Sequence, residues 1–204
     1  MTALAPVTLR GAHVTLEPLT PAHADALWDV ARDPDLWRWA LSDVRTRADL
    51  DVYLRAAFDA QAAGTALPFA IVAGGQVAGS TRFGNVDLAN RRLEIGWTFV
   101  GARWQRTSVN TEAKLLLMRH AFETLGVRRV EWKTDARNAA SRAALARLGA
   151  TEEGTLRQHM VRQDGTSRDT VYFSLLAGEW PAAEARLADM LAASADPGEG
   201  RAGT

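Results

Sequence analysis

The sequence WQRTSVNTEAK, residues 104–114, joins a predicted strand that ends near Val100 to a predicted helix that runs to about Gly126. Its turn consists of small and hydroxylated residues, which leave backbone N–H groups uncovered. The first N–H groups of a helix lack internal partners and carry partial positive charge, so this junction is suited to bind an anion such as a pyrophosphate. Arg106 and Lys114 add positive charge nearby.

Two common phosphate-binding patterns, G-x-x-x-x-G-K-[ST] and G-x-G-x-x-G, do not occur in the chain. Most strand–turn–helix junctions bind nothing, so the junction alone is a weak signal. If the junction binds a phosphate, its loop must be of a kind different from both of these patterns.

The pattern Gln105-x-x-Ser108-x-Asn110 resembles the pyrophosphate loop of the GNAT superfamily of acyl-CoA N-acyltransferases, [QR]-x-x-G-x-[GA]. The run of residues 105–114 is similar to the RimJ/RimL-like branch, the ribosomal-protein N-terminal acetyltransferases, and the resemblance covers roughly residues 10–180. Ser108 and Asn110 replace glycine or alanine of many members, but both are small and Asn tolerates left-handed backbone. The resemblance implies that acetyl-CoA binds here, through Gln105, Arg106, Thr107, Ser108, Val109, Asn110 and Thr111.

The composition of the chain argues against several other classes of protein. The chain has 204 residues, enough for one sizeable domain, expected at residues 7–193 with flexible tails at 1–6 and 194–204. With 24 basic and 24 acidic residues the net charge is zero, which argues against nucleic-acid or membrane partners. No cysteine occurs and the four histidines are scattered, so we expect no metal. No signal peptide or long apolar run is visible, which predicts a cytoplasmic protein; a homodimer is left open.

Hydrophobic periodicity predicts strands at residues 14–19, 68–73, 77–86, 92–100, 129–134, 155–162 and 168–176. It predicts helices at residues 21–31, 48–63, 109–125, 138–148 and 181–193. The strand–helix–strand segment 92–134 indicates one parallel pair. The fold class is therefore α/β (α+β), a mixed, mostly antiparallel sheet of six or seven strands. The resemblance adds helices on both faces and a V-shaped split between the fourth and fifth strands.

Chemistry is expected first on the strand LEIGWTF, residues 93–99. Alternation predicts Leu93, Ile95, Trp97 and Phe99 on one face, and Glu94, Gly96 and Thr98 on the other. Family members often carry a glutamate here that acts as the base, directly or through water, so Glu94 is the candidate. A solvated glutamate on a half-exposed strand is the alternative. Backbone groups of Trp97, Thr98 and Phe99 are expected to pair with the pantetheine arm of the cofactor.

Asn138 and Ser141 follow the next strand. An asparagine there is most often a helix N-cap, and Ser141 could simply face solvent. Gly149 lies eleven residues after Asn138, which matches the family pattern N-x-x-[AS]…G. Much of the superfamily has a tyrosine acid where this chain has Leu145, while the ribosomal-protein branch has a serine where Ser141 stands. The resemblance thus implies Asn138 on the pantetheine arm and Ser141 as the acid near the sulfur.

Four further residues complete the candidate site. Tyr172 is the reserve acid, and Arg142 is a weak candidate for the 3′-phosphate of the cofactor. Trp37 and Trp39 lie where the family lines its acceptor pocket, with core packing as an equal alternative. We therefore expect an acetyl-CoA-dependent N-acetyltransferase acting on a primary amine, a protein N-terminus or a small molecule, by direct transfer in a ternary complex. A non-catalytic CoA-binding or sensor module is the alternative.

Overall fold

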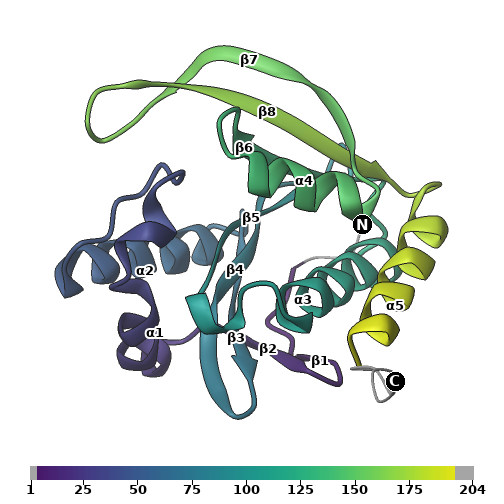
Figure 1. The fold of residues 1–204 in the computed structure, drawn as a ribbon, viewed down its shortest axis with the longest axis horizontal. Coiled ribbons are helices and arrows are strands. Elements are labelled where there is room, and N and C mark those ends of the chain that lie inside the picture. Colours follow the sequence, from purple (N-terminus) through teal and green to yellow (C-terminus); the bar gives the residue numbers. More distant parts are fainter. Residues whose placement is uncertain (1–3, 196–204) are drawn as a thin grey trace, which may run out of the picture.

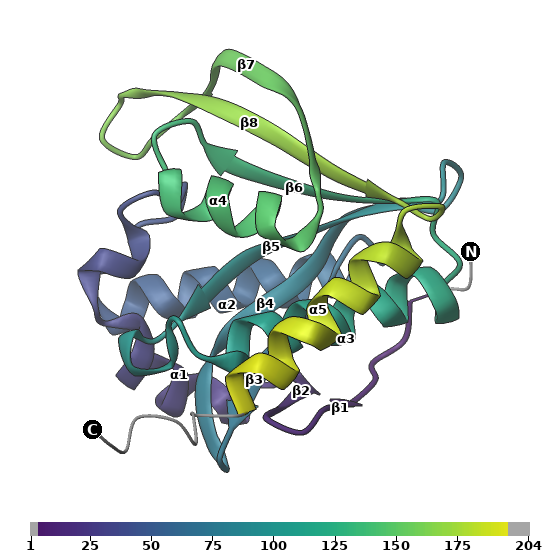
Figure 2. The same ribbon diagram turned by 45° about the vertical axis from the view of Figure 1, so that its right-hand side comes forward.

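A computed structural model describes residues 4–195; residues 1–3 and 196–204 are outside the described part. One mixed sheet runs through the molecule in the strand order β1-β2-β3-β4-β5-β6-β8-β7 (Figures 1 and 2). The strands are β1 (Leu9–Arg10), β2 (Val14–Pro18), β3 (Leu67–Ala73), β4 (Gln76–Asp87), β5 (Arg92–Val100), β6 (Arg129–Asp135), β7 (Thr151–Val161) and β8 (Ser167–Leu176). The helices are α1 (Ala24–Ala31), α2 (Arg47–Ala62), α3 (Ser108–Arg119), α4 (Ala139–Leu148) and α5 (Trp180–Ala195).

The expected fold class is confirmed, with differences in detail. The described sheet has eight strands because the two-residue β1 pairs with β2, too short to leave an alternating pattern. β7 begins at Thr151, four residues before the predicted start. α3 gives way to a π-helical turn at His120–Thr124, where the sequence predicted one regular helix. Residues 194 and 195 belong to α5, and the remainder of the predicted C-terminal tail lies outside the described residues.

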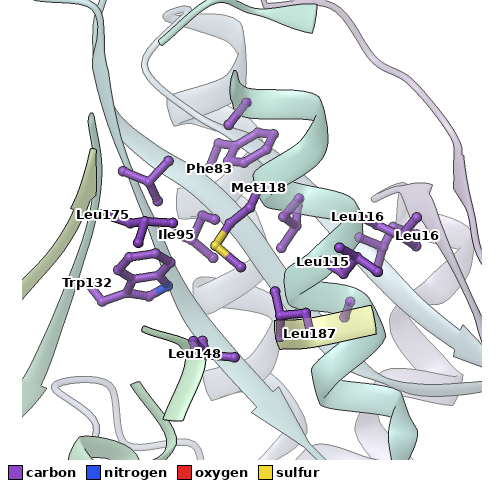
Figure 3. Close-up of a cluster of buried hydrophobic side chains, with 14 of the residues drawn as sticks. Leu16, Phe83, Ile95, Leu115, Leu116, Met118, Trp132, Leu148, Leu175 and Leu187 are labelled. Atoms are coloured by element: carbon purple, nitrogen blue, oxygen red, sulfur yellow. The ribbon is translucent and has the colours of Figure 1, made fainter. Parts of the chain in front are cut away.

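Helices cover both faces of the sheet, and each face has its own core. α3, α4 and α5 pack on one face, here called the α3 face, and α1 and α2 on the other, the α1 face (Figure 1). Figure 3 shows side chains of the α3-face core, which come from several strands and from three helices. Met118, Leu117 and Ile95 are almost wholly buried there. α3 is therefore buried over much of its circumference.

The sheet opens between β5 and β6, its only parallel pair in the described residues. These strands pair only at Arg92–Glu94 with Arg129–Glu131. β5 continues to Val100 and β6 to Asp135 without further pairing to each other. The predicted V-shaped split is confirmed, and it leaves one edge of β5 unpaired beyond Glu94.

A β-bulge in β5 makes one sequence prediction wrong. The β4–β5 register passes from Arg82↔Gly96 to Ser80↔Phe99, so β5 has one extra residue, and Trp97 has a φ of +50°. The bulge reverses the alternation of side chains that follow it. Leu93 and Ile95 therefore lie in the α3-face core, whereas Phe99 lies in the α1-face core, not with them as predicted.

An internal carboxylate ties the start of α3 to the N-terminal strands. Glu112, which is 5% exposed, accepts hydrogen bonds from the backbone N–H groups of Ala12, His13 and Val14 at 2.8, 2.6 and 2.7 Å. A Cβ at Gly11 would lie 2.4 Å from the Glu112 carboxyl carbon, so only glycine leaves room for this contact. Glu112 thus has a structural function, because it fixes the helix that begins at the candidate cofactor loop.

Candidate active site

The loop before α3 has the backbone of an anion site. Thr107 is the N-cap residue of α3, and its hydroxyl accepts from the Val109 N–H at 3.3 Å. Arg106 has a φ of +59°, and within the described residues neither its N–H nor that of Thr107 makes a hydrogen bond. Successive free N–H groups at a left-handed residue beside a helix N-terminus form an anion-binding concavity. The Gln105 side chain instead donates to the Val100 carbonyl at 2.9 Å, which holds the loop to the end of β5.

The first turn of α3 is partly covered by the end of α5. The Ser108 and Ser194 hydroxyls lie 3.2 Å apart, and α3 and α5 run side by side in both views of the ribbon (Figures 1 and 2). Ser108 is half-buried and Asn110 is half-buried, while Val109 and Thr111 face inward. Within residues 101–111 no acidic side chain occurs that would repel a phosphate.

Lys114 lies one turn into α3, beneath this loop. It is 7% exposed, and its Nζ donates to the Thr98 hydroxyl at 3.1 Å. Burial lowers the pKa of Lys114 to about 8, because no carboxylate offsets the loss of solvent. The Thr98 hydroxyl also lies 2.8 Å from that of Thr81. A hydrogen-bonded chain thus runs from α3 across β5 to β4, next to the split.

The side chain of Trp97 lies on the α1 face because of the bulge. Its ring fills the space above Gly84, where an added Cβ would be 2.2 Å from a ring carbon. The Arg82 guanidinium lies 4.9 Å from the Trp97 ring centroid and 5.1 Å from that of Tyr53. The Trp97 carbonyl accepts from the Tyr53 hydroxyl at 2.9 Å. That carbonyl is therefore engaged within the protein.

Glu94 faces the same side of the sheet and is 6% exposed. Its Oε2 accepts from Lys133 Nζ at 2.7 Å and from Asn85 Nδ2 at 2.7 Å. Its Oε1 makes no hydrogen bond among the described residues and lies over Gly96, where an added Cβ would be 2.9 Å from it. Glu94 is thus not a solvated surface glutamate, and one of its oxygens is available to an incoming proton donor.

A polar cavity adjoins the partners of Glu94. Its volume is about 800 Å³, and Asn85, Lys133 and Tyr172 are among its lining residues. Lys133 Nζ lies 5.2 Å from the Tyr172 ring centroid. Burial lowers the pKa of Lys133, but the hydrogen bond and the charge of Glu94 outweigh it, so the net pKa is raised. A second cavity of about 390 Å³ lies between residues 4–6 and α2, away from these groups.

Asn138 and Arg142 at α4 are already engaged within the protein, whereas the side chain of Ser141 is not. Asn138 is the N-cap of α4, and its Oδ1 accepts from the Ser141 N–H at 3.0 Å, as the N-cap alternative predicted. The Ser141 side chain is half-buried and makes no hydrogen bond among the described residues. Arg142 donates to the Ala136 carbonyl at 3.3 Å and to Glu152 at 3.1 Å. The structure therefore directs Arg142 toward β7.

The two tryptophans differ in position. Trp37 is 5% exposed, packs with Tyr53 and Phe99, and donates from Nε1 to the Ala31 carbonyl at 2.7 Å. It belongs to the α1-face core, the alternative that the sequence left open. Trp39 is half-buried, and Arg137 from the β6–α4 loop lies 5.4 Å from its ring centroid. Of the two tryptophans, only Trp39 thus lies near the end of β6, beside Arg137.

The partners that hold Glu94 cannot be recognised within its own strand, because Asn85 and Lys133 come from two other strands. The sequence of β6 does indicate which of its residues share a face, because charged and apolar residues alternate, as in Glu131, Trp132 and Lys133. Trp132 and Val130 lie in the α3-face core, so the charged residues between them must face α1 and α2. Pairing among those charges depends on strand order, which the pattern does not give.

Comparison with known proteins agrees with this geometry. A family model described as "Acetyltransferase (GNAT) domain" matches residues 13–151. The chain is 35% identical over 106 residues to "Putative ribosomal N-acetyltransferase YdaF" of Bacillus subtilis, a match covering 52% of this chain. The match spans 57% of that relative, just over half of its length.

Two solved structures match over most of their length. A GCN5-related N-acetyltransferase from Brucella melitensis is 34% identical with a TM-score of 0.86, and the match covers 93% of this chain and 87% of that one. Mycobacterium smegmatis RimJ in complex with CoA-disulfide is 26% identical with a TM-score of 0.80, over 91% of this chain and 95% of that one.

The chain belongs to the GNAT family of N-acetyltransferases, as the family model over residues 13–151 shows. The relatives named for ribosomal acetyl transfer and for RimJ support the RimJ/RimL-like branch. Acetyl transfer is thus the class of reaction. No helix among the described residues is long and apolar enough to cross a membrane.

Proposed function

We propose that the protein transfers an acetyl group from acetyl-CoA directly to a primary amine in a ternary complex. The observation that carries this proposal is the geometry of Glu94: a buried carboxylate with one oxygen held by Lys133 and Asn85 and the other unengaged. It lies on the strand whose edge opens into the split. The absence of cysteine from the sequence agrees with direct transfer, because no thiol can carry the acetyl group.

The acetyl donor would be held in two places. The free N–H groups of Arg106 and Thr107, with the α3 N-terminus, fit a pyrophosphate. The unpaired edge of β5 beyond Glu94 fits an extended arm that pairs with backbone as an added strand does. The RimJ structure in complex with CoA-disulfide supports a CoA-type ligand in this fold.

The proposed reaction makes a C–N bond and breaks a C–S bond. Glu94 Oε1 takes a proton from the acceptor ammonium, directly or through water, so that the free amine can attack the thioester carbonyl. The departing thiolate takes a proton from Ser141, with Tyr172 as the reserve donor, and the donor regains a proton from the nitrogen, which loses its second proton as the amide forms. Glu94 then releases its proton to solvent. Asn138 has a positioning function through its cap, because it sets the first turn of the helix that carries Ser141.

The acceptor enters, in this proposal, from the α1 face. The cavity of about 800 Å³ beside Lys133 and Tyr172 is on that face, whereas Trp39 lies outside its lining, beside Arg137 just after the end of β6. The relative YdaF is named as a ribosomal N-acetyltransferase, which favours a peptide N-terminus over a small amine. The cytoplasmic location expected from the sequence remains a prediction, as does the single domain at residues 7–193.

A turnover screen tests the function. Acetyl-CoA is incubated with peptide N-termini, polyamines and aminoglycosides, and thiol release is measured. We expect release with at least one primary amine and none with its N-acetylated form. Acetyl-CoA binding by calorimetry with no release on any acceptor would instead indicate a CoA-binding module.

A further inference from the structure

Arg168 is a buried arginine without an acidic partner. It lies on β8 and is 7% exposed, and no hydrogen bond or ion pair joins its side chain to any described residue. Its Nε in particular is inaccessible and unpaired. Burial, and then the charge of Arg162, lower the pKa of Arg168. A buried guanidinium with no carboxylate is costly, so its retention calls for an explanation.

The carboxylate of Asp135 is already paired with two other arginines and makes no ion pair with Arg168. Asp135, which is 1% exposed, forms ion pairs with both Arg162 and Arg137. Arg162 also donates to the Arg38 carbonyl at 3.4 Å, which ties the β7–β8 hairpin to the segment after α1. Two arginines thus share one carboxylate, and Arg168 adds a third positive charge that no carboxylate pairs with.

A second unused donor lies on the same face of β8. Thr170 is 1% exposed, and its hydroxyl has no partner within the described part of the chain. Residues two apart on a strand point to one face and are about 7 Å apart, a distance that an arginine side chain spans. One carboxylate could therefore accept from both the Arg168 guanidinium and the Thr170 hydroxyl.

This face of β8 is the face of the proposed acceptor site. Val171 and Phe173 lie in the α3-face core, so Arg168, Thr170 and Tyr172 face the other side. Tyr172 lines the polar cavity, and its register partner on β6 is Lys133, which holds Glu94. The charge of Glu94 raises the pKa of Arg168, but burial and the charge of Arg162 outweigh it.

We propose that Arg168 and Thr170 bind a carboxylate of the acceptor, so that the protein acetylates amines that carry a carboxylate close to the amino group. This inference rests on the proposed function, because it assigns the acceptor class of the same site. An arginine binds a carboxylate by two parallel hydrogen bonds, which a carboxamide cannot reproduce. The carboxylate could be the α-carboxylate of a free amino acid or an acidic side chain at the second position of a peptide.

Matched acceptor pairs test the specificity and separate these two sources. One pair is alanine and alaninamide; the other is Ala-Asp-Ala-amide and Ala-Asn-Ala-amide. A hydrogen-bonded charge pair predicts that kcat/KM is roughly 10- to 100-fold higher for the carboxylate member of at least one pair. In Arg168→Gln this ratio should fall to about one, whereas Arg168→Lys should keep part of it. Arg157→Gln, an exposed arginine of β7, is the control and should keep the wild-type ratio.

A binding experiment tests the same inference without requiring acetyl transfer. The Nε–H resonance of Arg168 is assigned as the one lost in Arg168→Lys and followed during titration with N-acetylalanine and N-acetyl-Asp-Ala-amide. We expect one of them to shift it, and the N-acetylalaninamide control to leave it in place. Turnover without a carboxylate preference, or a resonance that no carboxylate moves, would overturn the inference and leave the proposed function standing. A shift without any turnover would support the inference and count against the proposed reaction.

Discussion

Lys133 Nζ lies 2.7 Å from Glu94 Oε2, and it reaches Glu94 from two residues beyond Glu131, the last residue of β6 that pairs with β5 in the described sheet. The ion pair therefore fixes the carboxylate at the base of the split, where the paired part of the two strands ends. Asn85 holds the same oxygen from β4. The other oxygen is left to act on the acceptor.

Glu94→Gln removes the proposed base. We expect turnover with a verified amine to fall about 10²-fold or more at pH 7, because the ammonium must then lose its proton to solvent. Raising the pH should partly restore the rate, since more of the acceptor is already free amine. Glu131→Gln is the control: Glu131 is a buried carboxylate on the same face, paired with Arg92 and Arg129, and should change the rate much less. Equal losses in both variants would contradict the base assignment.

Ser141→Ala removes the proposed acid. Turnover should fall roughly 10²-fold while acetyl-CoA affinity stays nearly constant, because the hydroxyl matters most as charge develops on sulfur. Raising the pH should not restore turnover in Ser141→Ala, although it should partly restore turnover in Glu94→Gln. Tyr172→Phe is measured beside it. Wild-type turnover in Ser141→Ala, with a loss in Tyr172→Phe, would move the acid to the tyrosine.

Ser108→Asp tests the cofactor loop. A carboxylate in the first turn of α3 would repel a pyrophosphate bound to the N–H groups of Arg106 and Thr107, so calorimetry should show sharply weaker acetyl-CoA binding. Ser194→Ala removes only the hydroxyl that contacts Ser108 and should leave the affinity close to wild type. An aspartate variant that binds as tightly as wild type would show that the phosphates lie elsewhere.

Lys114→Met tests the buried lysine. The folded-state pKa of about 8 lies below the ordinary 10.5, so the unfolded state binds more protons between these values and stability rises with pH across this window. Removing the ammonium should raise the free energy of unfolding at pH 7 by roughly 2–4 kcal/mol, less the lost hydrogen bond to Thr98. The gain should disappear near pH 10.5, as urea denaturation at both pH values would measure. Lys133→Met, which leaves Glu94 without its partner, should lose stability at pH 7.

Glu112→Gln tests the contact between α3 and the N-terminal strands. Three backbone N–H groups donate to this carboxylate, and an amide can accept only at its oxygen, so one buried donor is left unpaired. We expect a loss of about 2–3 kcal/mol in the free energy of unfolding, measured by thermal or urea denaturation. Glu184→Gln, in a surface ion pair with Arg119, should lose less than about 1 kcal/mol. Comparable losses in the free energy of unfolding in the two variants would contradict the structural function of Glu112.

The sequence by itself determined the local elements and the loop. Small residues at 107–110 after a strand, with apolar residues around the circumference of residues 109–125, are enough to predict a buried helix with a free N-terminus. Glu94 could be chosen because it stands beside glycine on a strand where members of the family that the sequence resembles often carry a glutamate. The crossover from β5 to β6 predicted the parallel pair, since a helix of that length permits little else.

Tertiary structure alone decided how these parts meet. The bulge at Trp97 depends on one extra residue relative to β4, a difference that no pattern within β5 reveals, and it moved Phe99 to the other face. The partners of Glu94 come from β4 and β6, and the three donors to Glu112 lie about a hundred residues away. Arg168 looks like any arginine of an edge hairpin in the sequence. Only the folded sheet shows that it is buried without a carboxylate, because burial and pairing are properties of neighbours distant along the chain.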